Sequence, residues 1–264
     1  MENTKHFALI TGASSGIGYE LAKLFAKDRF NLVIVGREGA SLQKTALVLE
    51  EQGVQVITVI ADLFEPNAAF NLYEQIKARN IQIDVLVNDA GQGVYGKFID
   101  TDLNQELDII QLNVASLVTL TKLFVREMVA RGSGKILNVA SIAGKVPGPY
   151  QAVYHGTKAF VHSFNEAVRA EIKDTPVTIT SLLPGPTDTN FFRKANMLDS
   201  KAVQEGELAD PADVARDGYE AMVAGKDMVI SGFKNKLQVA MGNITPDSML
   251  AEQTGKQQEP VDKS

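Results

Sequence analysis

The chain has 264 residues, of which 45% are hydrophobic and 22% charged, as is typical of one α/β domain with a large core. Its net charge of -6 and the lack of a basic block argue against nucleic acid as a partner, because phosphate binding needs clustered Lys and Arg. The absence of cysteine excludes disulfides and thiolate nucleophiles, and three histidines without a His-x-x-x-His pair predict no metal site.

The first residues run from a few polar positions directly into a short apolar strand, without the layout of a signal peptide. No apolar run reaches the roughly 18 residues that a membrane-spanning helix needs. We therefore expect a cytoplasmic protein with no membrane partner.

Short β-branched runs alternate with longer amphipathic segments along the chain. Each run is almost continuously apolar, as expected of parallel strands covered on both faces. The predicted strands are 7–12, 31–36, 55–61, 85–90, 135–141, 177–184 and 227–232, and the predicted helices are 17–27, 41–52, 66–79, 103–130, 154–173 and 212–224. This alternation predicts one α/β domain of Rossmann type over residues 1–253, a doubly wound parallel sheet of about seven strands with helices on both faces. A TIM barrel would need eight strands and has no place for a glycine-rich first turn.

Residues 188–208 interrupt this alternation after the sixth strand. They are weakly periodic, and we interpret them as a mobile helical lid over a substrate site. Phe191, Phe192, Met197 and Leu198 within it fit either the wall of an apolar substrate pocket or the lid's own packing. Residues 254–264 are polar and predict a flexible tail.

A glycine-rich turn, TGASSGIG at residues 11–18, follows the first strand and opens the first helix. Gly12 permits the tight turn, Gly16 lets the backbone approach a pyrophosphate, and Gly18 lets the helix pack close to the sheet. Exposed N–H groups at the start of the helix favour phosphate charge. The spacing differs from the plain G-x-G-x-x-G pattern, and a turn that binds nothing is the alternative.

The second predicted strand ends in VIVGREG, where an acidic residue would hold the ribose hydroxyls of NAD. Gly36 takes that place and Arg37 follows it. A guanidinium suits a 2′-phosphate by charge and by bidentate geometry, and Ser14 is placed to add a hydroxyl contact. Glu38 weakens this argument, and a solvated loop position is the alternative for Arg37. The pattern favours NADP(H) over NAD.

Candidate catalytic residues follow in the second half of the chain. Ser141 ends the fifth predicted strand, where ligands bind in open α/β sheets, and its hydroxyl is placed to polarise a substrate carbonyl. Tyr154 and Lys158 form a Y-x-x-x-K motif one helical turn apart. A free tyrosine has a pKa of about 10, and we expect the neighbouring ammonium to lower the pKa of Tyr154 toward the working range of a general acid or base.

These motifs, together with NDAG at 88–91, LNVAS at 112–116 and the Pro-Gly at 184–185, resemble the short-chain dehydrogenase/reductase family over roughly residues 5–235. The resemblance implies an NAD(P)-dependent enzyme that moves a hydride between nicotinamide and an alcohol or carbonyl substrate. Tyr154 would exchange a proton with an oxygen stabilised by Ser141, Lys158 would bind the nicotinamide ribose, and Asn113 would support a water connected to Lys158. Taken singly, Tyr154 and Lys158 fit a packed helix face, Ser141 an N-cap and Asn113 a polar core position.

The resemblance also implies a set of cofactor contacts. Asp62 corresponds to an adenine-contacting Asp, with a helix N-cap or loop residue as the alternative. Asp89 stands where the family has an Asn whose side chain hydrogen-bonds within the central sheet, whereas His155 and His162 are expected to be structural. The implied cofactor residues are Gly12, Ser14, Ser15, Gly16, Ile17, Gly18, Arg37, Asp62, Leu63, Asn88, Ala90, Gly91, Val114, Tyr154, Lys158, Pro184, Gly185 and Thr187.

Two other functions fit the same motifs, a 3-oxoacyl-type reductase and a catalytically silent dinucleotide-sensing protein. The intact set of Asn113, Ser141, Tyr154 and Lys158 favours an enzyme that acts on a small alcohol, ketone or aldehyde. The resemblance further implies a homodimer or homotetramer packed through the predicted helices 103–130 and 154–173. The apolar residues that fit either that interface or the core are Leu117, Leu120, Phe124, Phe160 and Phe164.

Overall fold

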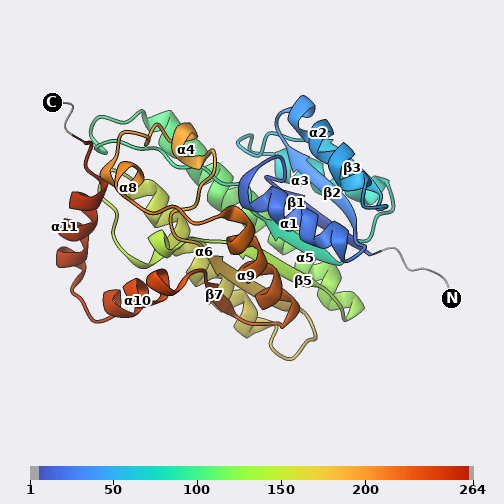
Figure 1. Cartoon of the computed structure of the whole chain (residues 1–264). Coiled ribbons are helices and arrows are strands. Elements are labelled where there is room, and N and C mark those ends of the chain that lie inside the picture. Colours follow the sequence, from blue (N-terminus) through green and yellow to red (C-terminus); the bar gives the residue numbers. More distant parts are fainter. Residues whose placement is uncertain (1–5, 262–264) are drawn as a thin grey trace.

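The computed structural model describes residues 6–261, and a seven-stranded parallel sheet forms the centre of the fold (Figure 1). The strands are β1 (Phe7–Thr11), β2 (Asn31–Gly36), β3 (Val56–Ile60), β4 (Val85–Asn88), β5 (Lys135–Val139), β6 (Thr178–Leu183) and β7 (Met228–Ile230). They lie in the order β3-β2-β1-β4-β5-β6-β7, and all neighbouring pairs are parallel. The predicted doubly wound sheet is confirmed. Its strand order reverses between β1 and β4, the place where such folds bind ligands.

Helices cover both faces of the sheet because successive side chains of each strand point to opposite faces. Ile10 and Ile34 pack with Phe25 in one core cluster, whereas Leu9 and Phe124 pack in the other. The helices are α1 (Gly16–Lys27), α2 (Gly39–Glu50), α3 (Ala68–Ala78), α4 (Leu103–Ile110), α5 (Leu117–Arg131), α6 (Ala152–Glu171), α7 (Phe191–Lys194), α8 (Lys201–Gln204), α9 (Pro211–Val223), α10 (Phe233–Gly242) and α11 (Asp247–Gln258). Burial of both strand faces explains the continuous apolar runs in the sequence.

The predicted helix 103–130 contains a change of helix type. A π-helical segment, η1 (Gln111–Ser116), joins α4 to α5. The whole stretch Leu103–Arg131 is long and apolar enough to cross a membrane by length and composition, yet half of its most apolar window is buried inside the domain. Its residues Leu117, Leu120 and Phe124 are buried, which assigns these three positions to the core of the subunit.

The C-terminal region differs from the prediction. The sequence analysis expected no helix after residue 224 and a flexible tail from residue 254, whereas α10 and α11 follow β7, and residues 254–258 are the end of α11. Among the residues of α11, only Leu250 and Gln258 are buried, so the segment lacks the apolar periodicity that identifies a helix in a sequence. Figure 1 shows α10 and α11 in red on the side of the molecule opposite α2 and β3. Residues 262–264 of the predicted tail lie outside the described residues.

Candidate active site

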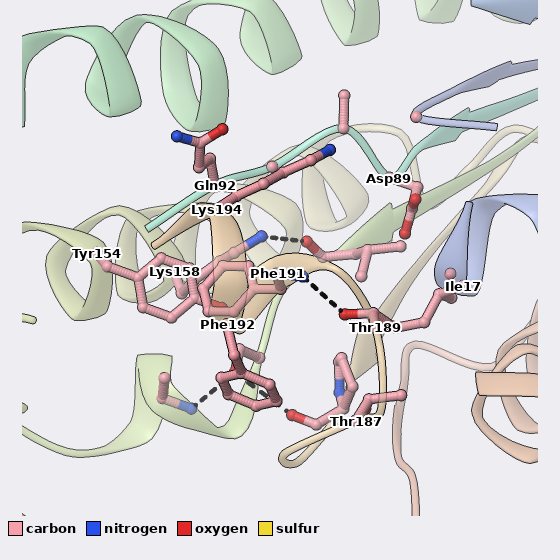
Figure 2. Close-up of a pocket in the computed structure, with 18 of the residues that line it drawn as sticks. Ile17, Asp89, Gln92, Tyr154, Lys158, Thr187, Thr189, Phe191, Phe192 and Lys194 are labelled. Atoms are coloured by element: carbon pink, nitrogen blue, oxygen red, sulfur yellow. Dashed lines mark hydrogen bonds between the residues drawn. The ribbon is translucent and has the colours of Figure 1, made fainter. Parts of the chain in front are cut away.

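A cavity of about 360 Å³ lies along the carboxyl ends of the strands, at the switch point of the sheet. Most of the predicted site residues line it, namely Gly12, Ser14, Ser15, Gly16, Ile17, Arg37, Leu63, Ala90, Gly91, Ser141, Tyr154, Lys158, Pro184, Gly185 and Thr187. Five predicted residues are not in its wall, namely Gly18, Asp62, Asn88, Asn113 and Val114. The cavity therefore brings together both ends of the predicted site, and Figure 2 shows its central part.

At one end of the cavity the glycine-rich turn provides a wall of backbone. Gly12 and Gly16 have φ of +75° and +60°, a backbone conformation that side chains disfavour. A Cβ on Gly18 would lie 2.5 Å from Asp89 Oδ2 and 2.8 Å from the Gly12 carbonyl oxygen, so this glycine allows α1 to pack against the turn. Ser15 makes no side-chain capping bond to α1, and the Gly18 N–H donates to the buried Asp89 carboxylate, so the N–H groups of Gly16 and Ile17 are the ones left for an anion. The turn thus fits the pyrophosphate of a dinucleotide.

The far end of the same wall carries the exposed Arg37. Its guanidinium lies over the Phe64 ring, with the Cζ atom 4.7 Å from the ring centroid. A Cβ on Gly36 would lie 3.0 Å from a methyl carbon of Leu42, so a larger residue there would crowd α2. Asp62 lies outside the cavity wall, and its Oδ1 accepts from the Phe64 N–H at 3.1 Å, the contact of a local turn.

The end of β4 corrects the expectation for Asn88. Asn88, expected as a cofactor contact, instead makes hydrogen bonds within the central sheet: its Nδ2 donates to Asn138 Oδ1 at 2.8 Å and to Thr121 Oγ1 at 3.1 Å. Asp89 lines the cavity and contacts the glycine-rich turn. Burial raises the pKa of Asp89 to about 7, whereas the charge of Lys158 opposes this rise. Adjacent side chains point to different sides of a strand, which accounts for the different surroundings of the two residues.

Ser141 and Tyr154 lie together on the substrate side of this wall. The Ser141 Oγ accepts from the Ala143 N–H at 3.0 Å and donates to the Pro184 carbonyl at 3.3 Å, so Ser141 also caps the 3-10 turn Ile142–Lys145. Burial raises the pKa of Tyr154 to about 12, against the lowering effect of its hydrogen bond with Ser141. The expectation that Lys158 lowers the Tyr154 pKa is wrong for this structure, because desolvation of the phenol dominates. Tyr154 therefore keeps its proton at neutral pH.

Lys158 and Asn113 flank the backbone of Gly91. Lys158 Nζ donates to the Val139 carbonyl at 2.8 Å and lies 5.9 Å from the Tyr154 ring centroid, while burial lowers the Lys158 pKa to about 8. A Cβ on Gly91 would lie 3.4 Å from both Lys158 Nζ and Asn113 Oδ1, so only a small residue leaves this approach open.

Asn113 is buried in the π-helical segment η1. Its amide contacts the backbone N–H and carbonyl of Gln92 at 3.0 and 2.9 Å and donates to Thr157 Oγ1 at 3.0 Å. These contacts match the polar core alternative, and the water between Asn113 and Lys158 stays a prediction.

The lid forms the apolar side of the cavity. The ring centroid of Phe191 is 5.0 Å from that of Tyr154 and 5.6 Å from that of Phe192 (Figure 2). Phe192 and Met197 are buried in a small apolar cluster of the lid, and both also line the cavity. Leu198 is half-exposed and lies outside this cavity. Three of the four apolar lid residues thus form the pocket wall and the lid packing at the same time.

Several residues that line the cavity were not predicted from the sequence, namely Asp89, Gln92, Gln151, Lys194, Gln238, Thr254, Gln257 and Gln258. Gln151 had a usable signal, because it stands one helical turn before Tyr154. The cavity residues of α10 and α11 had no such signal in the sequence, because only tertiary packing brings these two helices to the cavity. His155 holds this closure together, as expected of a structural histidine: Nδ1 lies 2.9 Å from the Val146 carbonyl and Nε2 lies 3.1 Å from Gln258 Nε2.

Comparison with known proteins agrees with this geometry. The family model of short chain dehydrogenases matches residues 6–199. A dehydrogenase/reductase SDR family member 7B from Danio rerio is 30% identical, covering 95% of this chain and 87% of the relative. The ketoacyl reductase HetN from a Nostoc strain is also 30% identical, over 91% of this chain and 85% of its own length. A solved short-chain dehydrogenase from Sphingobium yanoikuyae in complex with NADPH superposes with a TM-score of 0.81 at 25% identity, over 91% of this chain and 96% of the other.

Proposed function

This chain belongs to the short-chain dehydrogenase/reductase family, whose members are oxidoreductases acting on CH–OH groups, and we propose that it reduces a ketone or aldehyde with NADPH. One observation carries this proposal above the others: the phenol of Tyr154, with a pKa raised to about 12, lies in the cavity with Ser141 and Lys158. A protonated phenol beside a substrate carbonyl is placed to act as the general acid of a reduction.

The residues of the cavity fit a dinucleotide. Gly12, Gly16 and the open N-terminus of α1 would hold the pyrophosphate, and Arg37 with Ser14 would hold a 2′-phosphate. Lys158 would approach the nicotinamide ribose past Gly91. NADPH, when bound, supplies the hydride. The preference for NADPH over NADH rests on Arg37 and on the absence of an acidic residue at position 36, and the relative solved with NADPH supports it.

The protein's own groups would handle the substrate oxygen. Ser141 would turn its hydroxyl proton from the Pro184 carbonyl to the substrate carbonyl and polarise it, and Tyr154 would transfer its proton to this oxygen as the carbon is reduced. The Lys158 ammonium then stabilises the tyrosinate, which regains a proton from solvent. The pKa of Lys158 is about 8, so the ammonium form is populated below that pH. Phe191 and Phe192 exclude water beside the reacting atoms.

The replacement Tyr154→Phe tests the proposal. We expect kcat for a panel of ketones and aldehydes with NADPH to fall by roughly 10²–10⁴-fold, the usual contribution of a general acid. NADPH affinity, measured by nucleotide fluorescence, should stay unchanged. Tyr150→Phe is the matched control, because Tyr150 stacks on Tyr95 and lies outside the cavity wall. Equal turnover by the Tyr154→Phe variant and the native protein would refute the proposal, and NADPH binding without any turnover would favour the dinucleotide-sensing alternative.

A 3-oxoacyl substrate is a second candidate. The Nostoc relative, named a ketoacyl reductase, shares 30% identity over 91% of this chain, which supports including it. A 3-oxoacyl thioester in the same NADPH assay separates the two substrate classes, because only one of them should show a KM below the millimolar range.

We also propose that the protein is a homodimer or homotetramer. An apolar surface of α4 and α6 supports this, since Leu103 is 65%, Leu107 53% and Phe160 44% exposed. The Phe160 and Phe164 rings stack with centroids 5.9 Å apart, beside this surface. Exposed apolar patches of this kind commonly mark interfaces. The molar mass from light scattering tests the assembly, and a monomer at micromolar concentration would refute it.

A further inference from the structure

Two buried glutamines of the cavity carry polar atoms that have no hydrogen-bond partner among the described residues. Gln151 is 4% exposed and its Nε2 is unpartnered, while Gln258 is 8% exposed and its Oε1 is unpartnered. Both residues line the cavity. A buried polar atom without a partner destabilises a fold, and each such atom in a native protein needs an explanation. One explanation is a ligand that supplies the missing hydrogen-bond partners of the two glutamines.

The contacts of His155 fix the orientation of the Gln258 amide. His155 Nδ1 lies 2.9 Å from the Val146 carbonyl oxygen and must donate to it, since a carbonyl only accepts. Burial lowers the pKa of His155, which keeps the ring neutral and leaves Nε2 as an acceptor. The amide nitrogen of Gln258, at 3.1 Å, therefore donates to His155 Nε2. The Gln258 Oε1 is left as an acceptor without a donor.

The unpartnered amide nitrogen of Gln151 lies beside the reacting groups. A Cβ on Gly93 would lie 3.0 Å from Gln151 Nε2 and 2.8 Å from the Phe191 Cζ atom, so the amide and the Phe191 ring face the same point. The Phe191 ring is in turn 5.0 Å from the Tyr154 ring, centroid to centroid. Gln151 thus places a free donor next to the apolar wall of the substrate pocket.

The C-terminal helix holds the second glutamine in place. Tyr95 donates its hydroxyl proton to the backbone carbonyl of Gln258, and this tyrosine stacks on Tyr150 at 5.8 Å between centroids. The segment before α4 therefore supports the end of α11 through Tyr95, and Tyr150, just before α6, packs against that tyrosine. This support makes Gln258 a fixed part of the pocket wall.

We propose that Gln151 and Gln258 form a polar subsite that binds a second hydrogen-bonding group of the substrate, away from the carbonyl that is reduced. A hydroxyl is the neutral group that both accepts from an amide N–H and donates to an amide oxygen. Phe191, Phe192 and Met197 contact the carbon skeleton between the two polar ends. The substrate class is accordingly a hydroxylated ketone or aldehyde. This inference rests on the proposed function, because it concerns the substrate of the same site.

Matched pairs of ketones test the subsite in the native protein. One pair is cyclohexanone and its 4-hydroxy derivative; the other is 4-phenylbutan-2-one and its para-hydroxyphenyl analogue, which carries the hydroxyl farther from the carbonyl. In at least one pair we expect kcat/KM with NADPH to be roughly tenfold or more higher for the hydroxylated ketone, since a site built to bind a hydroxyl rejects the analogue lacking it. Equal kcat/KM within both pairs would overturn the subsite while leaving the reductase proposal intact. No turnover of any of the four ketones would overturn the reductase proposal itself, and the subsite with it.

Variants then connect the preference to the two glutamines. Gln151→Leu and Gln258→Leu should each reduce the preference for the hydroxylated over the plain ketone to within about threefold. Gln253→Leu is the matched control, because Gln253 lies on the exposed side of α11 outside the cavity wall and should keep the full preference. The melting temperature of Gln151→Leu should not fall below that of the native protein, since the change removes an unpartnered amide. A preference that survives both cavity variants would contradict the assignment.

Discussion

The wall of the cavity near β1, β2 and α1 consists mainly of backbone, whereas the wall near α7 and α11 consists of side chains. At the first, hypothetical Cβ atoms on Gly12 and Gly18 would lie 2.9 and 2.5 Å from Asp89 Oδ2, so the backbone shape is the binding feature. At the second wall, Phe191 reaches the cavity from α7, which lies between β6 and β7 in the chain, and Gln258 reaches it from α11 after the last strand. The two walls therefore differ in how well they tolerate substitution. The backbone wall allows few changes, whereas changes of side chain in the other wall can alter specificity while the fold stays the same. Figure 1 shows α11 on the side of the molecule away from β1, β2 and α1.

Among the changes that compare the two walls, the largest effect on the fold is expected at the backbone wall, from Gly18→Ala. The new Cβ would lie 2.8 Å from the Gly12 carbonyl oxygen, so either the turn or α1 must shift. We expect a loss of about 1–3 kcal/mol in the free energy of unfolding, the usual cost of overpacking, and roughly tenfold weaker NADPH binding. Urea denaturation and fluorescence titration measure the two effects. Gly156→Ala is the matched control: its Cβ meets nothing within 4 Å on an exposed helical position, so this change should stabilise the fold slightly.

Arg37→Ala should weaken NADPH binding at the same wall without destabilising the fold. The exposed guanidinium contacts the Phe64 ring and is proposed to pair with a 2′-phosphate. We expect the Kd of NADPH to rise about tenfold or more, while the Kd of NADH and the melting temperature stay nearly constant. Arg79→Ala, at the end of α3, is the control. A native enzyme that prefers NADH would contradict the assignment of Arg37.

Asp89→Asn probes the electrostatic interaction between the backbone wall and Lys158. The folded protein binds the Asp89 proton more tightly than the unfolded chain does, because burial raises this pKa from 3.8 to about 7. The resulting contribution to stability is complete below pH 3.8 and is lost as pH rises toward 7. An ionised Asp89 would also repel the cofactor phosphates. We therefore expect NADPH affinity to fall above pH about 7, by at most tenfold per pH unit.

The Asp89→Asn variant should lose this part of the pH dependence, in stability and in NADPH affinity. Lys158 and Lys194 are the charged groups that act on Asp89, and the pKa of Lys158 is about 8. If NADPH affinity or stability of the variant still changes with pH above 8, that change comes from the titration of Lys158. Calorimetric Kd values between pH 6 and 9 measure the profile, and identical profiles for the native protein and the variant would contradict this role.

The smallest effect on the fold and on NADPH binding is expected at the side-chain wall, from Phe191→Ala. The ring contacts Tyr154 and Phe192 but is only partly buried, so its loss should raise KM for ketones by about tenfold and leave the Kd of NADPH unchanged. Phe233→Ala is the matched control, because Phe233 is 81% exposed at the start of α10. If Phe191→Ala weakened NADPH binding as strongly as Gly18→Ala, the division of the cavity into two differently built ends would be wrong.

The two regions also differ in what the sequence predicted. The seven strands, the glycine-rich turn and the cluster of Ser141, Tyr154 and Lys158 were all predicted, because each depends on local patterns: apolar runs, glycine positions and helical spacing. The pKa of Tyr154 was predicted in the wrong direction, since helical spacing indicates a nearby ammonium but says nothing about the desolvation of the phenol. The places of Asn88 in the sheet and Asp89 in the cavity were missed for a related reason, because they depend on which face of β4 each side chain occupies.

The sequence alone determined the sheet, the glycine-rich turn and the grouping of Ser141, Tyr154 and Lys158. These features arise from interactions within single strands, turns and helices, so the chain encodes them locally. The tertiary structure decided which side chains close the cavity: α11 carries almost no apolar pattern, yet its Gln258 lies against His155, far away in the sequence. A contact of this kind depends on how the last helices pack on the completed domain, and no local pattern records it.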